Sequence, residues 1–367
     1  MESLPPKEYP GPVYQWQEGA ENLDGYRSGG YHPTHIGDRY LNERYEIIHK
    51  LGSGAYSTVW LARDHASARN VALKILISAS SNVDEGCFET RVLRALASKQ
   101  DTHPGYKYVS TLLDEFTIVG PNGTHRCIVS EAAGCNVAQS KEASLTWVFP
   151  VDIARAIAAQ ALLGLEYIHA CGVVHADLHS NNILFKTSTL ETLDVDQLYK
   201  RVGEPQRLPV TRLDKAPNGP EVPYYCVPPA LMFTPAENIK DAQIIISDFG
   251  ESPHTHIPDR WWEKWARRSD FFLEDKEWKQ DTEHAHAPYF RPLAERLTLM
   301  RGGGDPKTCE FTVAELKALE ELLRGMLAYE PGERISAGQA VGSEWMRQWG
   351  HPAMLDGGVE SGAGSEN

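Results

Sequence analysis

Residues 175–182 read His-Ala-Asp-Leu-His-Ser-Asn-Asn, and this stretch decides how the rest of the chain is interpreted. It places the carboxylate of Asp177 shortly before the carboxamide of Asn182. A second acidic motif, Asp248-Phe249-Gly250, directly follows the apolar run Ile244-Ile245-Ile246, which is typical of a buried strand. Phosphoryl transfer needs a carboxylate beside the attacking hydroxyl and oxygen ligands for the hard cation Mg²⁺. The spacing of Asp177, Asn182 and Asp248 can provide both.

A lysine and a glutamate further upstream can complete such a site. In Val71-Ala72-Leu73-Lys74-Ile75 the period of two places Ala72 and Lys74 on one face of a strand. A lysine on that face needs a negative partner. Glu89, on the helix predicted over residues 88–96, can be one partner, and nucleotide phosphates can be the other. The alternative is that Glu89 is an ordinary solvated glutamate on a helix surface.

The stretch Gly52-Ser53-Gly54-Ala55-Tyr56-Ser57-Thr58-Val59 lies between two predicted strands. Small residues in such a turn let backbone N–H groups approach phosphate oxygens. Glycine turns also occur in many hairpins that bind nothing, so the segment by itself fits a structural turn equally well. Lys74 on the next strand and the acidic motifs further along favour the phosphate-binding interpretation.

With these motifs in this order, the sequence resembles the eukaryotic protein kinases, and more closely the SR-protein kinase family in its fungal form. The resemblance covers about residues 24 to 349, apart from one insertion and one gap. It implies an α+β fold with two lobes, a β-rich N-lobe and a helical C-lobe, and the use of ATP and Mg²⁺. The stretches that carry it are GGYHPTHIGD (Gly29–Asp38), RYEIIHKLGSGAYSTVWLARD (Arg44–Asp64), VALKIL (Val71–Leu76), HADLHSNNIL (His175–Leu184), ISDFGES (Ile246–Ser252) and MLAYEPGERISA (Met326–Ala337).

The same resemblance implies roles for individual residues. Lys74 would hold the α and β phosphates, Glu89 would fix Lys74, and Asp177 would accept the proton of the substrate hydroxyl. Asn182 and Asp248 would bind Mg²⁺. The nucleotide would also be contacted by Leu51, Gly52, Ser53, Gly54, Ala55, Tyr56, Ser57, Thr58, Val59 and Ala72, with backbone near Glu131 to Ala133 at the adenine edge and Ser130 behind it, where a serine leaves unusual room.

Three residues depart from the general kinase pattern. Ser57 stands where many kinases have the third glycine of the loop, as it does in SR-protein kinases. Ala176 replaces the arginine that clamps an activation-loop phosphate in many kinases, which predicts a geometry that does not depend on that phosphate. His179, a further catalytic candidate, replaces a common lysine. Because a histidine can lose its charge near neutral pH, we expect its stabilisation of the transferring phosphoryl group to depend on pH.

The largest departure is a gap after Asp248-Phe249-Gly250-Glu251-Ser252. Within a few residues the chain reaches Pro258-Asp259-Arg260-Trp261-Trp262, which resembles a segment that the family carries well beyond its activation segment. The sequence contains no Ala-Pro-Glu triplet. We therefore expect an incomplete C-lobe, without activation segment or central helices and with a deletion near residues 251–258. Either the sequence is a mis-joined or exon-skipped gene product, which the near-complete flanks favour, or it is a genuine truncated relative.

Composition shifts predict the domain organisation. Residues 1–42, rich in Gly, Pro and Tyr, are predicted to be an extended N-terminal arm, and residues 43–134 the N-lobe. Residues 135–350 are predicted to form the C-lobe, in which the proline-rich stretch 186–242 would be a surface insertion rather than core. Residues 351–367 are predicted to be a disordered tail.

Local patterns predict several elements within these domains. The apolar, β-branched runs 45–51, 58–62 and 70–76 predict a three-stranded meander, and two more strands are expected around the turn Pro121-Asn122-Gly123. An apolar stripe predicts a helix over 153–168. Two capping boxes are predicted to open later helices, one formed by Thr312 with Glu315 and one by Ser336 with Gln339.

Composition limits the class of protein. The chain has 367 residues, of which 41% are hydrophobic, and a formal net charge of −14, which excludes collagen-like and wholly disordered proteins. Six dispersed cysteines without a CxxC pair argue against a disulfide framework or a zinc ribbon. No apolar run reaches the roughly 20 residues of a membrane span, and no secretory leader is visible. We expect a monomer of the cytoplasm and nucleus that contacts neither membranes nor nucleic acid directly.

The leading hypothesis is an ATP-dependent serine/threonine protein kinase that phosphorylates Arg/Ser-rich splicing factors. The acidic balance suits such basic substrates. Two alternatives stay open. The chain could be a truncated pseudokinase that binds nucleotide as a scaffold, or a small-molecule phosphotransferase, because Asp177-Leu178-His179 followed by Asn182 also resembles the catalytic loop of aminoglycoside and choline kinases.

Overall fold

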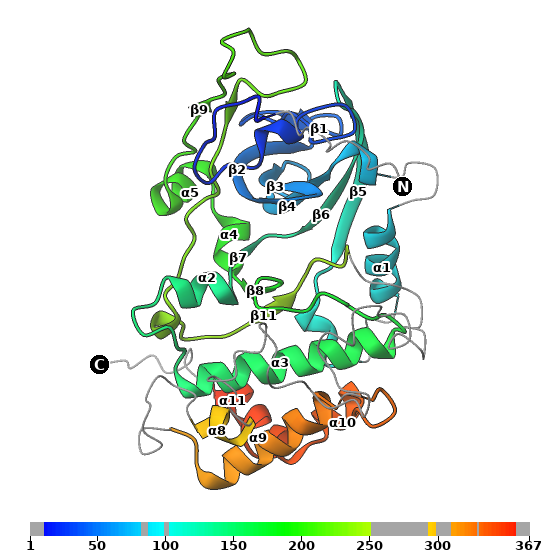
Figure 1. Cartoon of the computed structure of the whole chain (residues 1–367), viewed down its shortest axis with the longest axis vertical. Helices are drawn as coiled ribbons and strands as arrows, with labels where there is room; N and C mark the ends of the chain where they lie inside the picture. The colour runs from blue at the N-terminus through cyan, green and yellow to red at the C-terminus, as the bar shows by residue number, and fades with distance from the viewer. Residues whose placement is uncertain are drawn as a thin grey trace, which may run out of the picture.

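The computed structural model describes residues 11–81, 87–98, 103–250, 293–298, 310–328 and 330–356. These residues form two lobes, an upper lobe built on a twisted sheet and a lower lobe built on helices (Figure 1). The predicted two-lobed α+β fold is therefore confirmed. The predicted deletion near 251–258 lies outside the described residues and stays a prediction.

The N-lobe is a six-stranded antiparallel sheet in the order β1-β2-β3-β4-β6-β5. The predicted meander is confirmed, since each run of apolar and β-branched residues forms one strand and the turn 121–123 joins β5 to β6. One face of the sheet buries a cluster around Tyr45, Trp60 and Leu73. The strands are β1 (Arg39–Tyr40), β2 (Tyr45–Gly54), β3 (Ser57–Asp64), β4 (Arg69–Leu76), β5 (Leu112–Gly120) and β6 (Gly123–Glu131), with helix α1 (Phe88–Ala97) beside them and the 3₁₀ turns η2 (Ser78–Ser80) and η3 (Tyr106–Tyr108).

The C-lobe is organised around one long helix, α3 (Val151–Ala170), which crosses below the sheet in Figure 1. A small sheet in the order β11-β8-β7 lies between the lobes. Its strands are β7 (Ala133–Asn136), β8 (Ile183–Lys186) and β11 (Ile244–Ile246). The other described helices of this lobe are α2 (Val137–Glu142), α8 (Leu293–Thr298), α9 (Val313–Met326), α10 (Ala337–Val341), the π-helical turn η7 (Met346–Gly350) and α11 (His351–Asp356).

The interpretation of residues 186–242 as a surface insertion is wrong. This segment forms α4 (Ser188–Thr192), α5 (Val195–Val202), β9 (Leu208–Pro209), β10 (Tyr225–Cys226) and η4 (Ala236–Asn238). Leu190 and Leu198 are buried against Ile48 and Leu61 of the N-lobe sheet. In Figure 1, α4 and α5 lie on the side of the sheet away from α1. The insertion therefore supplies part of the N-lobe core.

The N-terminal segment is not a free arm over its described part. Residues 11–40 are mostly irregular apart from η1 (Leu23–Gly25) and β1, yet Tyr14, Leu23, Tyr26 and Tyr31 are buried. They pack in one cluster with Val210, Val222 and Cys226 of the insertion. Residues 11–40 are therefore ordered by contact with the distant segment 186–242. No local sequence pattern reveals this contact.

Two further sequence predictions need correction. Thr312 does cap α9 by accepting from the N–H of Glu315, but the Glu315 carboxylate binds Arg155 on α3, so the box is not reciprocal. The box predicted at Ser336 is confirmed. The predicted tail begins with a helix, α11, in which Ala353 is buried, and residues 357–367 lie outside the described part. Of the helices that the structure describes, none combines the length and apolar character needed to cross a bilayer.

Candidate active site

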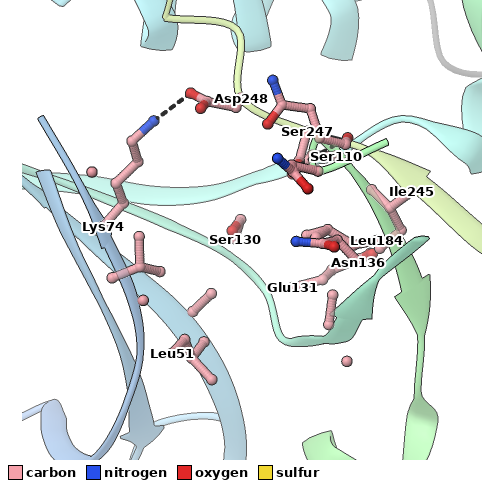
Figure 2. A pocket seen from close by; sticks show the side chains of 18 of the residues that line it. Leu51, Lys74, Ser110, Ser130, Glu131, Asn136, Leu184, Ile245, Ser247 and Asp248 are labelled. Carbon is pink, nitrogen blue, oxygen red and sulfur yellow. Dashed lines mark hydrogen bonds and ion pairs between the residues drawn. The ribbon is translucent and has the colours of Figure 1, made fainter. Parts of the chain in front are cut away.

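A cleft of about 380 Å³ opens between the two lobes. Figure 2 shows the sheet residue Leu51 on one side of it and Leu184 and Ile245 of the small sheet on the other. Val59 and Ala72 also line the sheet side, where the alternation of strands β3 and β4 directs them. The cleft thus has two apolar walls, which suits a flat aromatic group.

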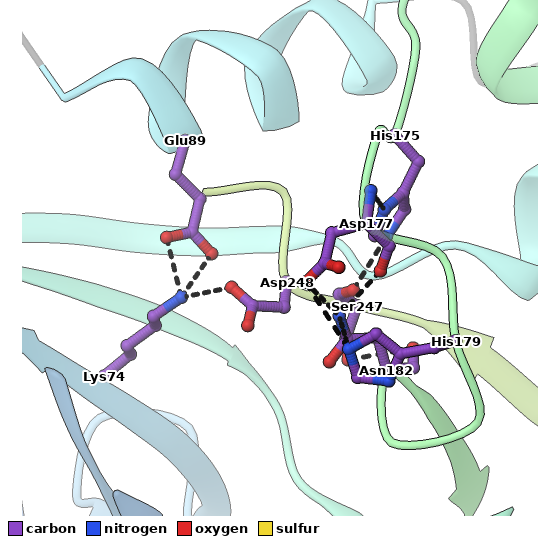
Figure 3. A network of polar contacts seen from close by, with 8 residues as sticks. All are labelled: Lys74, Glu89, His175, Asp177, His179, Asn182, Ser247 and Asp248. Atoms are coloured by element: carbon purple, nitrogen blue, oxygen red, sulfur yellow. Dashed lines mark hydrogen bonds and ion pairs between the residues drawn. The ribbon is translucent and has the colours of Figure 1, made fainter. Parts of the chain in front are cut away.

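Lys74 is the charged centre of this cleft. Its Nζ lies 2.9 and 2.8 Å from the two carboxylate oxygens of Glu89 on α1, and 2.8 Å from Oδ1 of Asp248 (Figure 3). Glu89 is buried, so it is not the solvated helix-surface residue of the alternative interpretation. The predicted pairing of Lys74 with Glu89 is present, and it joins strand β4 to helix α1.

The charges of this group stabilise one another. Burial alone would lower the pKa of Lys74, but the carboxylates of Glu89 and Asp248 outweigh burial and raise it above its ordinary value. Burial likewise acts to raise the pKa of Asp248, and the Lys74 ammonium overcomes it, so the net shift is downward. Lys74 is therefore a permanent cation and Asp248 a permanent anion at neutral pH.

The loop at residues 175–182 brings the other predicted groups to the same place. The amide nitrogen of Asn182 donates to the backbone oxygen of Asp177 at 2.9 Å, and Nε2 of His179 lies 3.4 Å from Oδ2 of Asp177. His175, which is buried, contacts the carbonyl of Ser247 through Nε2 at 3.0 Å and so ties this loop to the residue before Asp248. Figure 3 shows Asp248 between Lys74 and this loop.

Backbone strain marks both halves of this arrangement. Ala176 and Asp248 have φ values of 64° and 65°, in the left-handed region that non-glycine residues rarely adopt. Such conformations persist only where the surrounding structure enforces them, and they cluster at functional sites. Here His175 and the fully buried Phe249, whose rings are 4.8 Å apart, hold the two strained residues in place.

Comparison with known proteins agrees with this geometry. Residues 45–197 match the family model of the protein kinase domain. Protein kinase dsk1 of Schizosaccharomyces pombe is 41% identical over 165 residues, which are 45% of this chain and 30% of that protein. Serine/threonine-protein kinase SKY1 of Saccharomyces cerevisiae is 36% identical over 195 residues, or 51% and 26% of the two chains. SRSF protein kinase 3 of Homo sapiens is 37% identical over 168 residues, or 46% and 30%. Over the matched residues the chain is therefore similar to the protein kinases, and among them to these three relatives. It spans between 26% and 30% of the length of these three relatives.

The glycine-rich loop is the hairpin between β2 and β3. Its residues Gly52, Ser53, Gly54 and Ser57 line the cleft. Ala55 and Tyr56 form the exposed tip and are not among the described lining residues. Thr58 was assigned wrongly as a nucleotide contact. It is fully buried, and its Oγ1 accepts from Nε1 of Trp60 at 3.0 Å.

The end of the cleft where the sequence predicts the adenine edge is formed by the passage from β6 to β7. Ser130, Glu131 and Ala133 all line it, as predicted, and Ser130 pairs across the sheet with Ala72. Figure 2 shows the small Ser130 side chain facing the space between Lys74 and Glu131. A larger side chain would fill that space.

Sequence reasoning missed one wall of the cleft. Ala230, Met232 and Phe233 of the insertion line it. The Ala230 N–H donates to the Lys50 carbonyl at 2.8 Å, and the Thr234 carbonyl accepts from Oγ of Ser140 at 2.6 Å. This strap, residues 230–234, therefore runs from the N-lobe to the C-lobe. The apolar run Ala230–Phe233 within a proline-rich stretch was the available signal, but nothing local shows what it covers.

The donor atoms fit the Mg²⁺ and ATP that the family implies. Mg²⁺ prefers oxygen ligands and usually keeps waters and phosphate oxygens beside one or two protein groups. Asp248 supplies a carboxylate, and Asn182, whose amide nitrogen faces Asp177, directs its amide oxygen elsewhere. In the described part of the chain no group of three or more His, Cys, Asp or Glu side chains could hold a metal ion. Two side chains together with a nucleotide would therefore have to hold it.

Proposed function

We propose that this chain is an ATP-dependent serine/threonine protein kinase that phosphorylates Arg/Ser-rich splicing factors. The observation that carries the proposal is the contact of Lys74 with both Glu89 and Asp248 in a cleft that also holds Asn182, beside Asp177. These residues come from four separate places in the sequence, and a common ligand with phosphates and a metal ion explains why they meet.

The proposed mechanism gives each residue one task. Lys74, held by Glu89, binds phosphate oxygens of ATP, and the Asp248 contact with Lys74 is exchanged for phosphate when the nucleotide enters. Asp248 and Asn182 would hold Mg²⁺, which neutralises charge on the phosphates. Asp177 orients the attacking hydroxyl and accepts its proton. Its side chain is 48% exposed, so a protein hydroxyl can reach it.

The substrate class is supported by charge and by the names of relatives. The chain has a formal net charge of −14, which favours encounter with an arginine-rich partner. One relative is named SRSF protein kinase 3. Transfer of that substrate class to this chain is part of the proposal, since the matched segment is 30% of that relative.

The test measures binding and turnover on the same purified chain. Calorimetry gives the affinity for Mg-ATP, and transfer of labelled γ-phosphate to an Arg/Ser-repeat peptide gives the turnover. We expect Asp177→Asn to abolish transfer while the ATP affinity stays within about twofold, because Asp177 serves the hydroxyl. We expect Asp248→Asn to weaken Mg-ATP at least tenfold, since a metal ligand and a charge are lost.

Each other outcome selects a different function. Binding of Mg-ATP without phosphorylation of any peptide would favour the nucleotide-binding scaffold. Phosphorylation of choline or an aminoglycoside, but of no protein, would favour the small-molecule phosphotransferase. A folded chain with no affinity for Mg-ATP would overturn the proposal.

A further inference from the structure

The tip of the glycine-rich loop is held from outside the cleft by a residue of the N-terminal segment. The hydroxyl of Tyr31 donates to the carbonyl of Gly54 at 2.8 Å and lies 3.5 Å from the carbonyl of Ala55. Gly54 lines the cleft, whereas Tyr31 is not among the described residues that do. Tyr31 therefore reaches the loop from the N-terminal segment rather than from within the described lining of the cleft.

Tyr31 itself is fixed on several sides. It is 6% exposed, and its ring packs edge-on against Tyr26 with the centroids 5.4 Å apart. Its N–H donates to the Gly25 carbonyl at 3.0 Å, and its carbonyl accepts from the Asn122 side chain at 2.7 Å. A Cβ added to Gly25 would lie 2.4 Å from the Tyr31 ring, so glycine is needed there to give the ring its place. These contacts therefore fix the position from which the Tyr31 hydroxyl donates to the loop.

This contact determines how one peptide group of the loop is turned. The peptide unit is planar and trans, so its N–H and C=O point in opposite directions. Because the Gly54 carbonyl is directed to the Tyr31 hydroxyl, the N–H of Ala55 in the same peptide unit points away from Tyr31, next to Gly54 of the cleft lining. The carbonyl of Tyr56 is also bound, by the N–H of Ile77 at 2.9 Å. Two carbonyl oxygens of the loop that would repel a phosphate thus have donors within the protein.

We propose that Tyr31 is a positioning residue for phosphate binding: its hydroxyl holds the Gly54 carbonyl so that the Ala55 N–H is preset to donate to a nucleotide phosphate. This inference rests on the proposed function, since it assumes that the cleft takes a nucleotide. It deepens that function by extending the phosphate site to a residue outside the sheet.

The test compares ligands that differ only in their phosphates. We expect Tyr31→Phe, which removes one oxygen atom, to weaken Mg-ATP and Mg-ADP about five- to tenfold, the worth of one hydrogen bond. Adenosine should bind as it does to the unchanged chain, within about twofold. Tyr40→Phe is the matched control, because the Tyr40 hydroxyl belongs to the same segment but contacts Thr34 and Asp38 instead of the loop. It should leave all three affinities unchanged.

A second measurement does not depend on nucleotide. Amide hydrogen exchange of residues 54–57 should be about fivefold faster in Tyr31→Phe than in Tyr40→Phe, with equal exchange in the rest of the sheet. Equal loss of adenosine and ATP affinity, or unchanged exchange at the loop, would overturn the role of Tyr31. A looser loop in a chain that binds no nucleotide at all would instead overturn the proposed function and the phosphate role together, while the tether itself would stand.

Discussion

Replacing Lys50 by methionine should destabilise the protein severely, although Lys50 contacts no ligand. Its side chain is fully buried in strand β2, where its ammonium pairs with Glu21 and lies 5.3 Å from the centre of the Trp60 ring. The Glu21 carboxylate also accepts from the Tyr26 hydroxyl. The pair joins the N-terminal segment to the strand that leads into the glycine-rich loop.

The magnitude follows from what each variant leaves buried. Lys50→Met leaves the Glu21 carboxylate, which is 2% exposed, without its cation, and removing one partner of a buried pair costs about 3 to 5 kcal/mol. In the double variant Glu21→Leu with Lys50→Met no charge is left unpaired, and such apolar replacements range from neutral to stabilising by about 1 to 4 kcal/mol. The double variant should therefore be more stable than Lys50→Met by about 3 kcal/mol or more.

Urea unfolding followed by tryptophan fluorescence measures both differences, with Lys141→Met as control. Lys141 is an exposed lysine on α2, so its replacement should change the free energy of unfolding by less than about 0.5 kcal/mol. The reasoning fails if Lys50→Met costs less than about 1 kcal/mol. The single variant Glu21→Leu is measured as well. The reasoning fails equally if the double variant loses as much free energy of unfolding as Lys50→Met and Glu21→Leu lose together, because the two charges would then act independently.

Four shorter predictions test other parts of the structure. Leu198→Ala should lower the free energy of unfolding in urea by about 2 to 5 kcal/mol, because Leu198 of the insertion is fully buried. A loss below about 1 kcal/mol would show that the insertion is not part of the N-lobe core. The unchanged chain should bind an ATP analogue with a benzyl group on the adenine amine, and Ser130→Phe should weaken that analogue more than tenfold while ATP affinity is kept; equal effects on both nucleotides would place Ser130 elsewhere. His179→Ala should lower the rate of peptide phosphorylation while the affinity for Mg-ATP stays within about twofold, because Nε2 of His179 lies 3.4 Å from Oδ2 of Asp177, and an unaltered rate would exclude His179 from the transfer step. Burial, and then His125 as a neighbour, lowers the pKa of His32 to about 4, so between pH 6.5 and 4 the unfolded chain binds this proton more readily than the folded one. His32→Gln should therefore remove roughly 3 kcal/mol of the fall in the free energy of unfolding over that range, to which His49, His125 and His169, whose pKa values burial also lowers, contribute as well.

The sequence was sufficient to find a set of polar residues that the structure brings together. Lys74, Glu89, Asn182 and Asp248 line one cleft, and Asp177 lies beside Asn182, while their catalytic roles stay a prediction. They could be found because their chemistry restricts them to a few residue types and the strands and helices around them are strongly periodic. Strand period alone placed Lys74 and Ala72 on the ligand side.

The parts that the sequence did not reveal depend on contacts between distant segments. Leu190 and Leu198 lie among other apolar residues, such as Leu193 and Val195, but their burial depends on a sheet that lies more than a hundred residues earlier. Thr58 belongs to the loop motif, but strand alternation turns it away from the cleft toward Trp60. At Thr312 the predicted helix start was right, because its side chain accepts from the N–H of Glu315. The predicted return bond between the Glu315 carboxylate and the backbone N–H of Thr312 was wrong, since Arg155 is a stronger partner for this buried carboxylate.

Phosphoryl transfer needs a site that binds the nucleotide and a site that holds the attacking hydroxyl, and the structure shows these two sites built to different degrees. The nucleotide side is built from described elements that support one another: Lys74 is held by a buried glutamate, Phe249 is fully buried beneath α1, and Tyr31 fixes the loop. On the hydroxyl side Asp177 and His179 are each about half exposed. Water around these groups weakens charge interactions with a reacting phosphoryl group, so we expect turnover to depend on a bound peptide that covers them. Nucleotide affinity should therefore be insensitive to the peptide, whereas hydrolysis of ATP without peptide should be slow. A chain that hydrolysed ATP as fast alone as with peptide would show that the catalytic groups need no cover.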